Sequence, residues 1–184
     1  LTQLPGTMAI GHVRYSTTGS SVISNAQPFL VHHADEYYAL AHNGNLINAQ
    51  ALRAELETRG SIFQSTMDSE VIIHLMAPHL KDSFEDALVH ALSKVEGAYS
   101  VVMLTRNKVV ATRDPRGFRP LSLGKLNNHG WVIASETCAF DLIGAQYLRD
   151  IEPGEIVIID EAGLRSISPF PPMKRCRCIF EMIY

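Results

Sequence analysis

The stretch SFEDALVHALSKVEGAYSVVMLTRNKVVAT, residues 83–112, decides the predicted fold class. In its first half, apolar residues recur three or four positions apart, as the inner face of a helix requires: Phe84, Leu88, Leu92 and Val95. We therefore expect an amphipathic helix that begins at Ser83 and is ended by Gly97.

The second half of this stretch predicts an antiparallel hairpin. Tyr99–Thr105 and Lys108–Thr112 are rich in strand-forming residues, and Arg106-Asn107 provides a tight connection between them. A helix that leads directly into an antiparallel hairpin is typical of an α+β fold and argues against a doubly wound parallel sheet.

Two more helices are predicted upstream of this stretch. Asn48 is placed to cap the first helix and Gly60 to end it. The second helix is expected to begin near Asp68 and to close at Pro78. Its apolar stripe has helical spacing: Val71, Ile72, Leu75 and Met76.

The remaining pattern is mostly that of strands. Met8–Val13 is expected to be a buried strand, and Gln27–His33 with Tyr37–His42 a second hairpin, after which Asn43-Gly44-Asn45 interrupts the strand pattern. Downstream we expect strands at 121–124, 131–135, 155–160 and 164–167, and a short helix at 137–143.

Prolines in residues 169–172 predict a stiff connection and a domain boundary. We expect residues 1–170 to form one domain that is incomplete at its N-terminus. The apolar run Cys178–Tyr184 suggests that residues 171–184 are a linker and the first strand of a second, truncated domain.

Composition is that of a globular protein, with 46% hydrophobic and 19% charged residues among 184. A net charge of −3 gives no electrostatic case for nucleic-acid binding, and no apolar stretch is long enough to cross a bilayer. Three cysteines, an odd number, do not form a secreted disulfide framework, so we expect a reducing, cytoplasmic location.

Arg14 follows the expected strand Met8–Val13 and precedes a run of hydroxyl side chains. A guanidinium in this place could bind a small carboxylate through two parallel hydrogen bonds. The alternative is an ordinary surface arginine beside a loop.

Asn43 and Gly44 are candidates for an oxyanion hole. A side-chain amide and a glycine N–H could aim at one point where negative charge develops. However, Asn-Gly is also a common tight-turn dipeptide.

Asp68 is placed at the start of the second expected helix, where the helix dipole favours an ionised carboxylate that could hold a ligand ammonium. An ordinary helix cap is the alternative.

For two further groups of residues, the sequence pattern does not indicate a specific chemical role. Histidines such as His32, His33 and His42 lack metal-binding spacing and are interpreted as packing or surface residues. The turn Arg113–Leu121 could form the rim of an active site or simply join two strands.

Several of these segments, in this order, resemble the class II glutamine amidotransferases, the N-terminal-nucleophile glutaminases. The matching stretches are Gly11–Thr17, Asn25–Pro28, Asn43–Asn45, Asp68–Glu70 and Gly97–Ser100. The resemblance covers nearly the whole chain and implies a four-layer αββα sandwich with antiparallel sheets.

Within this family, Arg113–Leu121 and Ala134–Ala139 resemble the amidophosphoribosyltransferases of purine synthesis. Hexosephosphate aminotransferases share the early motifs but usually lack the Arg-Asp-Pro-x-Gly-x-Arg-Pro-Leu run. Asparagine synthetases have a related loop, but Ile151–Glu155 fits the purine enzymes better. A non-catalytic glutamine sensor is the alternative from another functional class.

The resemblance also implies roles for individual residues. Arg14, with Tyr15 and Thr17 nearby, would hold the glutamine α-carboxylate, and Asp68 would hold the α-ammonium. Asn43 and the Gly44 N–H would stabilise the oxyanion.

The family's nucleophile is an N-terminal cysteine, which no residue here matches, so we expect it to precede Leu1. A phosphoribosyltransferase domain, which uses phosphoribosyl pyrophosphate with Mg²⁺, is expected after Tyr184. In one subgroup a cysteine at the place of Cys178 is a ligand of a [4Fe–4S] cluster. The resemblance further implies a homo-oligomer when the protein is full-length.

Overall fold

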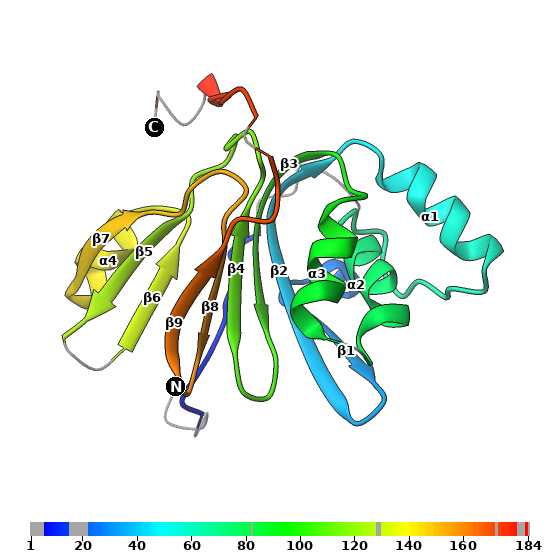
Figure 1. Ribbon diagram of the computed structural model, residues 1–184, viewed down its shortest axis with the longest axis horizontal. Helices are drawn as coiled ribbons and strands as arrows, with labels where there is room; N and C mark the ends of the chain where they lie inside the picture. The colour runs from blue at the N-terminus through cyan, green and yellow to red at the C-terminus, as the bar shows by residue number, and fades with distance from the viewer. Residues whose placement is uncertain are drawn as a thin grey trace.

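The computed structural model describes residues 6–14, 22–81, 83–127, 130–171, 173–179 and 183. Two antiparallel sheets dominate this part of the chain (Figure 1). The larger has the strand order β1 (Phe29–His33), β2 (Glu36–Leu46), β3 (Gly97–Leu104), β4 (Val109–Arg113), β8 (Ile156–Asp160) and β9 (Gly163–Ile167). The smaller has the order β6 (Gly130–Ala134), β5 (Ser122–Leu126) and β7 (Ala145–Asp150).

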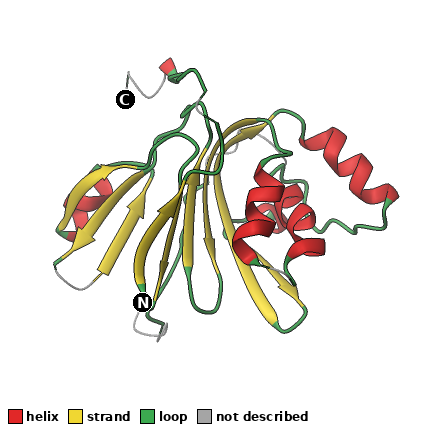
Figure 2. Ribbon diagram, in the orientation of Figure 1, coloured by secondary structure: helices red, strands yellow, loops and turns green. Residues whose placement is uncertain are grey.

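Helices lie on the outer sides of these sheets (Figure 2). One group packs on the larger sheet: α1 (Ala49–Thr58), α2 (Glu70–Met76) with the 3₁₀ turn η2 (Ala77–His79), and α3 (Phe84–Leu92). The helix α4 (Cys138–Ile143) accompanies the smaller sheet, and the short 3₁₀ turn η1 (Ile23–Asn25) precedes β1.

Strand alternation divides the core into two layers. On β8, Ile156 and Ile158 pack toward α2 and α3, whereas Val157 packs against Leu121 and Leu123 at the smaller sheet. On the outer face of that sheet, Gly124 leaves room for the ring of Phe140 from α4. The layers are therefore helix, sheet, sheet and helix, which confirms the expected αββα sandwich.

The helix boundaries agree closely with the sequence pattern. Ser83 caps α3, because its Oγ accepts a hydrogen bond of 3.2 Å from the Asp86 N–H. Asn48 precedes α1, but its side chain bonds to the Lys94 carbonyl and the Glu96 N–H instead of capping the helix. That side chain therefore fastens α1 to the segment that follows α3.

Some local predictions were wrong. Residues 8–13 form no strand, and Val13 is 97% exposed, because this segment pairs with no described strand. Asn43-Gly44-Asn45 does not interrupt β2 but continues it, opposite Ser100, Tyr99 and Ala98 of β3. Gly97 begins β3 rather than ending α3.

The smaller sheet contains a strand that the sequence pattern did not predict. The strand β7 (Ala145–Asp150) has a mixed sequence without clear alternation, and its residues are mostly exposed. Its place in the sheet is set by pairing with β5, across an irregularity between Leu123 and Gly124.

The described part of the C-terminal segment, 173–179 and 183, has no strand structure. The Cys176 N–H donates to the Arg116 carbonyl at 2.8 Å, and Arg175 pairs with Glu152. The expected domain boundary near residue 170 stays a prediction. No helix in the described residues has the length and apolar character needed to span a membrane.

Glu85 of α3 links the helical layer to the larger sheet through two ion pairs. Its Oε1 lies 2.9 Å from Lys108 Nζ and 2.8 Å from Arg165 Nη2. Partial burial acts to raise the pKa of Glu85, but hydrogen bonds from Arg165 and Lys108 outweigh it and lower the pKa to about 2.

We predict that Glu85→Gln lowers the free energy of unfolding by about 1–2 kcal/mol at pH 7. Because the pKa of Glu85 is lower in the folded state, its carboxylate stabilises the fold at pH values above its pKa in the unfolded chain, near 4.5. This contribution disappears as the pH falls toward 2. The wild-type and variant stabilities should therefore converge between about pH 4.5 and 2 in urea titrations. A difference that is unchanged over this range would contradict the role given to Glu85.

Candidate functional site

The candidate site lies along one edge of β2. On that side, β1 pairs with β2 only from Glu36 to Leu40, so the rest of β2 has no strand neighbour there among the described residues. In an antiparallel strand, successive N–H groups point alternately to the two sides. The N–H groups of His42, Gly44 and Leu46 therefore point to the same unpaired edge.

Side chains from two distant segments occupy this edge. The His42 N–H donates to Gln27 Oε1 at 2.6 Å, and the Leu46 N–H donates to Asp68 Oδ2 at 2.7 Å. By the same alternation, the Gly44 N–H points between those two side chains. The Gly44 donor and the Asp68 carboxylate therefore lie along the same edge, two residues apart on the strand.

Only glycine fits at position 44. Its φ is +148°, and a Cβ there would lie 2.0 Å from the Ala98 carbonyl oxygen and 2.9 Å from His42 Nε2. The close pairing of β2 and β3 therefore requires a residue without a side chain. The sequence allowed either a tight turn or an oxyanion hole at Asn43-Gly44. In the structure the pair lies within β2, where Gly44 lets the backbone of β3 approach closely.

Asn43 stands on the other face of the same strand. Because side chains alternate along β2, its amide projects away from the helices, whereas His42 projects toward them. Asn43 is half-buried. Its amide and the edge-directed Gly44 N–H therefore belong to adjacent residues and could act on one group near this edge.

Asp68 lies two residues before the start of α2, and its carboxylate has three partners. Besides Leu46, its carboxylate accepts from the Ser69 N–H at 2.8 Å and lies 3.4 Å from His42 Nδ1. Burial acts to raise the pKa of Asp68, but the hydrogen bonds from His42, Leu46 and Ser69 together lower it. Its side chain keeps 15% exposure, so a ligand can still reach the anion.

Arg14 is connected to the segment that carries Asp68. Its Nη1 donates to the Asn25 carbonyl at 3.1 Å. The fully buried Asn25 side chain donates to Thr66 Oγ1 at 2.8 Å and accepts from the Thr66 N–H at 2.9 Å. The cation and the anion are thus anchored to one short loop, two residues apart at Thr66 and Asp68.

Sequence reasoning missed most of this supporting set. Asn25 and Gln27 entered only through a family resemblance, and His42 was interpreted as a packing or surface residue. His12 is close enough to this region to be affected by it: burial and the nearby charges of His42 and Arg14 lower its pKa. The position of His42 immediately before Asn43-Gly44 was the one signal that could have pointed to it.

Two of the expected substrate-binding residues, Tyr15 and Thr17, lie outside the described residues. The described cysteines lie elsewhere. Cys138 is exposed on α4, which Figure 1 shows on the far side of the molecule from α2, and a hydrogen bond to Glu136 raises the pKa of its thiol.

Cys178 is half-buried in the C-terminal segment. Among the described residues, no group of three or more His, Cys, Asp or Glu side chains could hold a metal ion.

The Arg113–Leu121 turn is held by several hydrogen bonds. The Arg113 guanidinium donates to the carbonyl oxygens of Gly117, Arg119 and Ile151, and buried Asp114 accepts from backbone N–H groups within the turn. These bonds fix the shape of the turn and tie it to Ile151, so both the connecting role and the rim role stay predictions.

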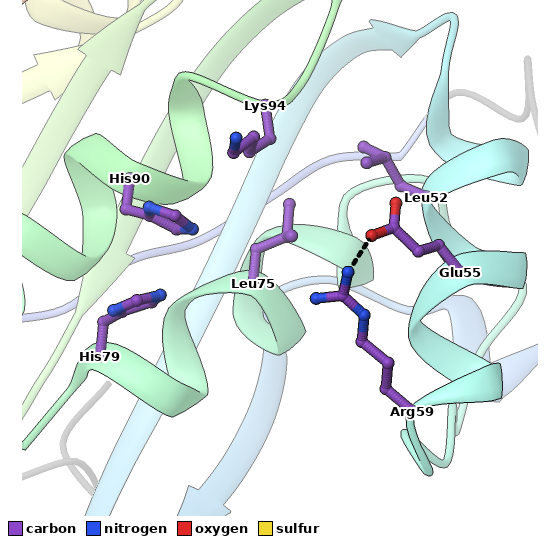
Figure 3. A pocket seen from close by; sticks show the side chains of 7 residues that line it. All are labelled: Leu52, Glu55, Arg59, Leu75, His79, His90 and Lys94. Atoms are coloured by element: carbon purple, nitrogen blue, oxygen red, sulfur yellow. Dashed lines mark hydrogen bonds and ion pairs between the residues drawn. The ribbon is translucent and has the colours of Figure 1, made fainter.

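A cavity of about 330 Å³ lies elsewhere, between α1 and the α2–α3 pair (Figure 3). Figure 3 shows Leu75 between the His79 and His90 rings on one side and Glu55 with Arg59 on the other. Glu55 is already paired with Arg59. This cavity is not lined by Arg14, Asn43 or Asp68, so it is separate from the candidate site.

Comparison with known proteins identifies the family of this chain. Residues 12–141 match the family described as glutamine amidotransferase domain. Over its whole length the chain is 50% identical to amidophosphoribosyltransferase 2 of Arabidopsis thaliana, a chloroplastic protein, and 43% identical to the amidophosphoribosyltransferase of Bacillus subtilis. It covers 33% and 39% of those two proteins, so it spans about a third of their length.

A solved structure agrees with the fold. The glutamine phosphoribosylpyrophosphate amidotransferase from B. subtilis, complexed with ADP and GMP, superposes with a TM-score of 0.85 at 42% identity. The match covers 94% of this chain and 37% of that one. With its αββα layers and a family match over most of its length, the chain belongs to the glutamine amidotransferase domain family.

Proposed function

We propose that this chain is the glutaminase part of an amidophosphoribosyltransferase. In this proposal the whole protein releases ammonia from glutamine and transfers it to phosphoribosyl pyrophosphate, giving phosphoribosylamine, glutamate and pyrophosphate. The observation that carries the proposal is the Gly44 N–H, which by strand alternation points to the edge of β2 between the Gln27 and Asp68 side chains, where no described strand pairs with it.

Free glutamine matches the charges of this site. Its α-ammonium would bind Asp68, the carboxylate that retains exposure, and its α-carboxylate would bind the Arg14 guanidinium. The side-chain amide would then lie toward Asn43 and Gly44, whose donors stabilise negative charge on the carbonyl oxygen. Fixed donors cost no reorganisation during the reaction, which is why a donor on a paired strand suits this role.

The hydrolysis itself requires a nucleophile that attacks the amide carbon. A thiol would form a thioester and release ammonia, and water would then release glutamate. None of the three cysteines is placed for this step: Cys138 is on α4, and Cys176 and Cys178 follow the last strand. Arg14, Asp68, Asn43 and Gly44 bind and polarise the substrate and do not supply the nucleophile.

Several features of the whole protein are part of the proposal. Mg²⁺ would accompany phosphoribosyl pyrophosphate in the whole protein. A [4Fe–4S] cluster needs four thiolates, and Cys178 would be one of them, so the described residues alone do not fit such a cluster. Free cysteines agree with a reducing, cytoplasmic compartment, and a homo-oligomeric enzyme is expected.

The acceptor specificity is tested with the full-length protein that contains this chain. We expect pyrophosphate release that requires both glutamine and phosphoribosyl pyrophosphate, measured in a coupled assay. Fructose 6-phosphate serves as the control acceptor. If the control acceptor is aminated instead, the chain belongs to a hexosephosphate aminotransferase. If the protein binds glutamine but releases no ammonia, the alternative of a non-catalytic glutamine sensor is favoured.

Replacing Arg14 tests carboxylate binding. Arg14→Ala removes a charge-assisted pair, and we expect glutamine affinity to fall by several kcal/mol, about a hundredfold or more. Calorimetric titration of the full-length protein with glutamine measures this change. Arg59→Ala, which removes an exposed cation on the segment that ends α1, is the control and should leave affinity unchanged. Unaltered affinity of Arg14→Ala would remove Arg14 from the site.

Replacing Asn43 tests oxyanion stabilisation. Asn43→Ala should reduce kcat for glutamine hydrolysis about a hundredfold or more, because one donor to the developing charge is lost. Circular dichroism should be unchanged. Asn107→Ala, in the turn between β3 and β4, is the matched control and should keep wild-type kcat. An effect of Asn43→Ala confined to KM would argue for substrate binding instead.

A further inference from the structure

A second carboxylate lies two residues after Asp68 and is almost completely enclosed. Glu70 begins α2 and is only 1% exposed. The proposed chemistry does not use it. A buried carboxylate is costly unless hydrogen bonds replace its lost water, so its partners indicate what it does.

The partners of Glu70 come mainly from the loop that precedes Asp68. One oxygen accepts from the Gln64 N–H at 2.7 Å. The other accepts from the Ser65 N–H at 2.9 Å and from Ser65 Oγ at 2.6 Å. Arg53 Nη2 and His74 Nε2 lie 3.4 and 3.6 Å from the carboxylate.

These contacts keep the carboxylate charged. Burial acts to raise the pKa of Glu70, but hydrogen bonds from His74, Gln64 and Ser65 outweigh it and lower the pKa to about 2. The negative charge is therefore present at any physiological pH and is shared among donors of residues 64 and 65. Such charge-assisted bonds are stronger than neutral ones and fix the loop firmly.

The same loop receives support from α1 and α2 side chains. Arg53 donates to the Ser65 carbonyl at 2.5 Å and stacks over the ring of Phe63, 4.0 Å from its centre. The His74 ring contacts Phe63 with a centroid distance of 4.1 Å. Arg53 and His74, which lie near the Glu70 carboxylate, therefore also contact the loop at Phe63 and Ser65.

The residues after Ser65 link this support to both charges of the site. Thr66 makes both hydrogen bonds to the Asn25 side chain, and the Asn25 carbonyl accepts from Arg14. Asp68 comes two residues after Thr66 and reaches the β2 edge at Leu46. The loop held by Glu70 thus connects the anchor of the cation to the anion.

We propose that Glu70 is a positioning residue, which sets the spacing between Arg14 and Asp68 by fastening the loop at Gln64 and Ser65. This inference rests on the proposed function, because it assigns those two charges to the ends of glutamine. Glu70 does not touch the substrate in this proposal; it acts through the Ser65–Asp68 segment.

Glu85 provides a matched comparison within the same fold. It also lies in the first turn of a helix and its pKa is also lowered to about 2, but its partners are Lys108 and Arg165, remote from Arg14 and Asp68. If the substitutions act only through stability, those at Glu70 and Glu85 should have the same effect on activity. If Glu70 acts through the glutamine site, only its substitution should change the use of glutamine.

The test uses full-length enzyme with Glu70→Gln and Glu85→Gln. In Glu70→Gln an amide N–H₂ must face backbone N–H groups, so the loop loses acceptors while the side chain keeps its size. We expect KM for glutamine to rise about tenfold or more, with kcat within about twofold and the ammonia-driven reaction unchanged. Glu85→Gln should leave KM within about twofold of wild type at a comparable loss of stability.

A second variant keeps the test decisive if Glu70→Gln does not fold. Thr66→Val retains the shape of the side chain but cannot accept from Asn25, and its KM for glutamine should rise in the same direction.

The inference is overturned if Glu70→Gln and Thr66→Val change KM no more than Glu85→Gln does. It is also overturned if Glu70→Gln lowers the ammonia-driven reaction as much as the glutamine-driven one. A wild-type enzyme that releases no glutamate from glutamine would instead refute the proposed function.

Discussion

The half of the β2 edge that has no strand neighbour in the described part of the chain is the constraint on which the site depends. Backbone N–H groups need acceptors, and beyond Leu40 the neighbouring strand no longer supplies them. Two side chains from distant segments do so, Gln27 at His42 and Asp68 at Leu46. The position of Asp68 is thus set by the most regular part of the fold, although Asp68 itself lies in a loop.

Loops are usually the least rigid part of a domain, so a site on a loop needs its own support. Here two buried side chains support the loop: Glu70, which bonds to Ser65, and Asn25, which bonds to Thr66. The two carboxylates, Asp68 and Glu70, have different surroundings. The Glu70 carboxylate is enclosed and bonded to protein groups, whereas the Asp68 side chain stays partly exposed.

The sequence was a good guide where local patterns decide the structure. Helical spacing located α1 to α3, and alternation with turn residues located the hairpins β1–β2 and β3–β4. It misjudged Asn43-Gly44-Asn45, because a turn dipeptide becomes strand when an opposing backbone fits against the glycine. The partners of His42 and Glu70 could not be foreseen, since hydrogen bonds across distant segments leave no periodic trace in a single sequence.

The charge states around the site form a consistent set. A zwitterionic ligand needs an anion and a cation that do not neutralise each other before it binds. Arg14 donates to the carbonyl of Asn25, while Asp68 accepts from backbone N–H groups and His42. Neutral dipoles and an imidazole therefore surround the Asp68 carboxylate, and a backbone carbonyl accepts from the Arg14 guanidinium. Thr66 and Asn25 join the segments that carry these two charges, so in the proposed site the geometry of the loop sets the distance that a ligand must span.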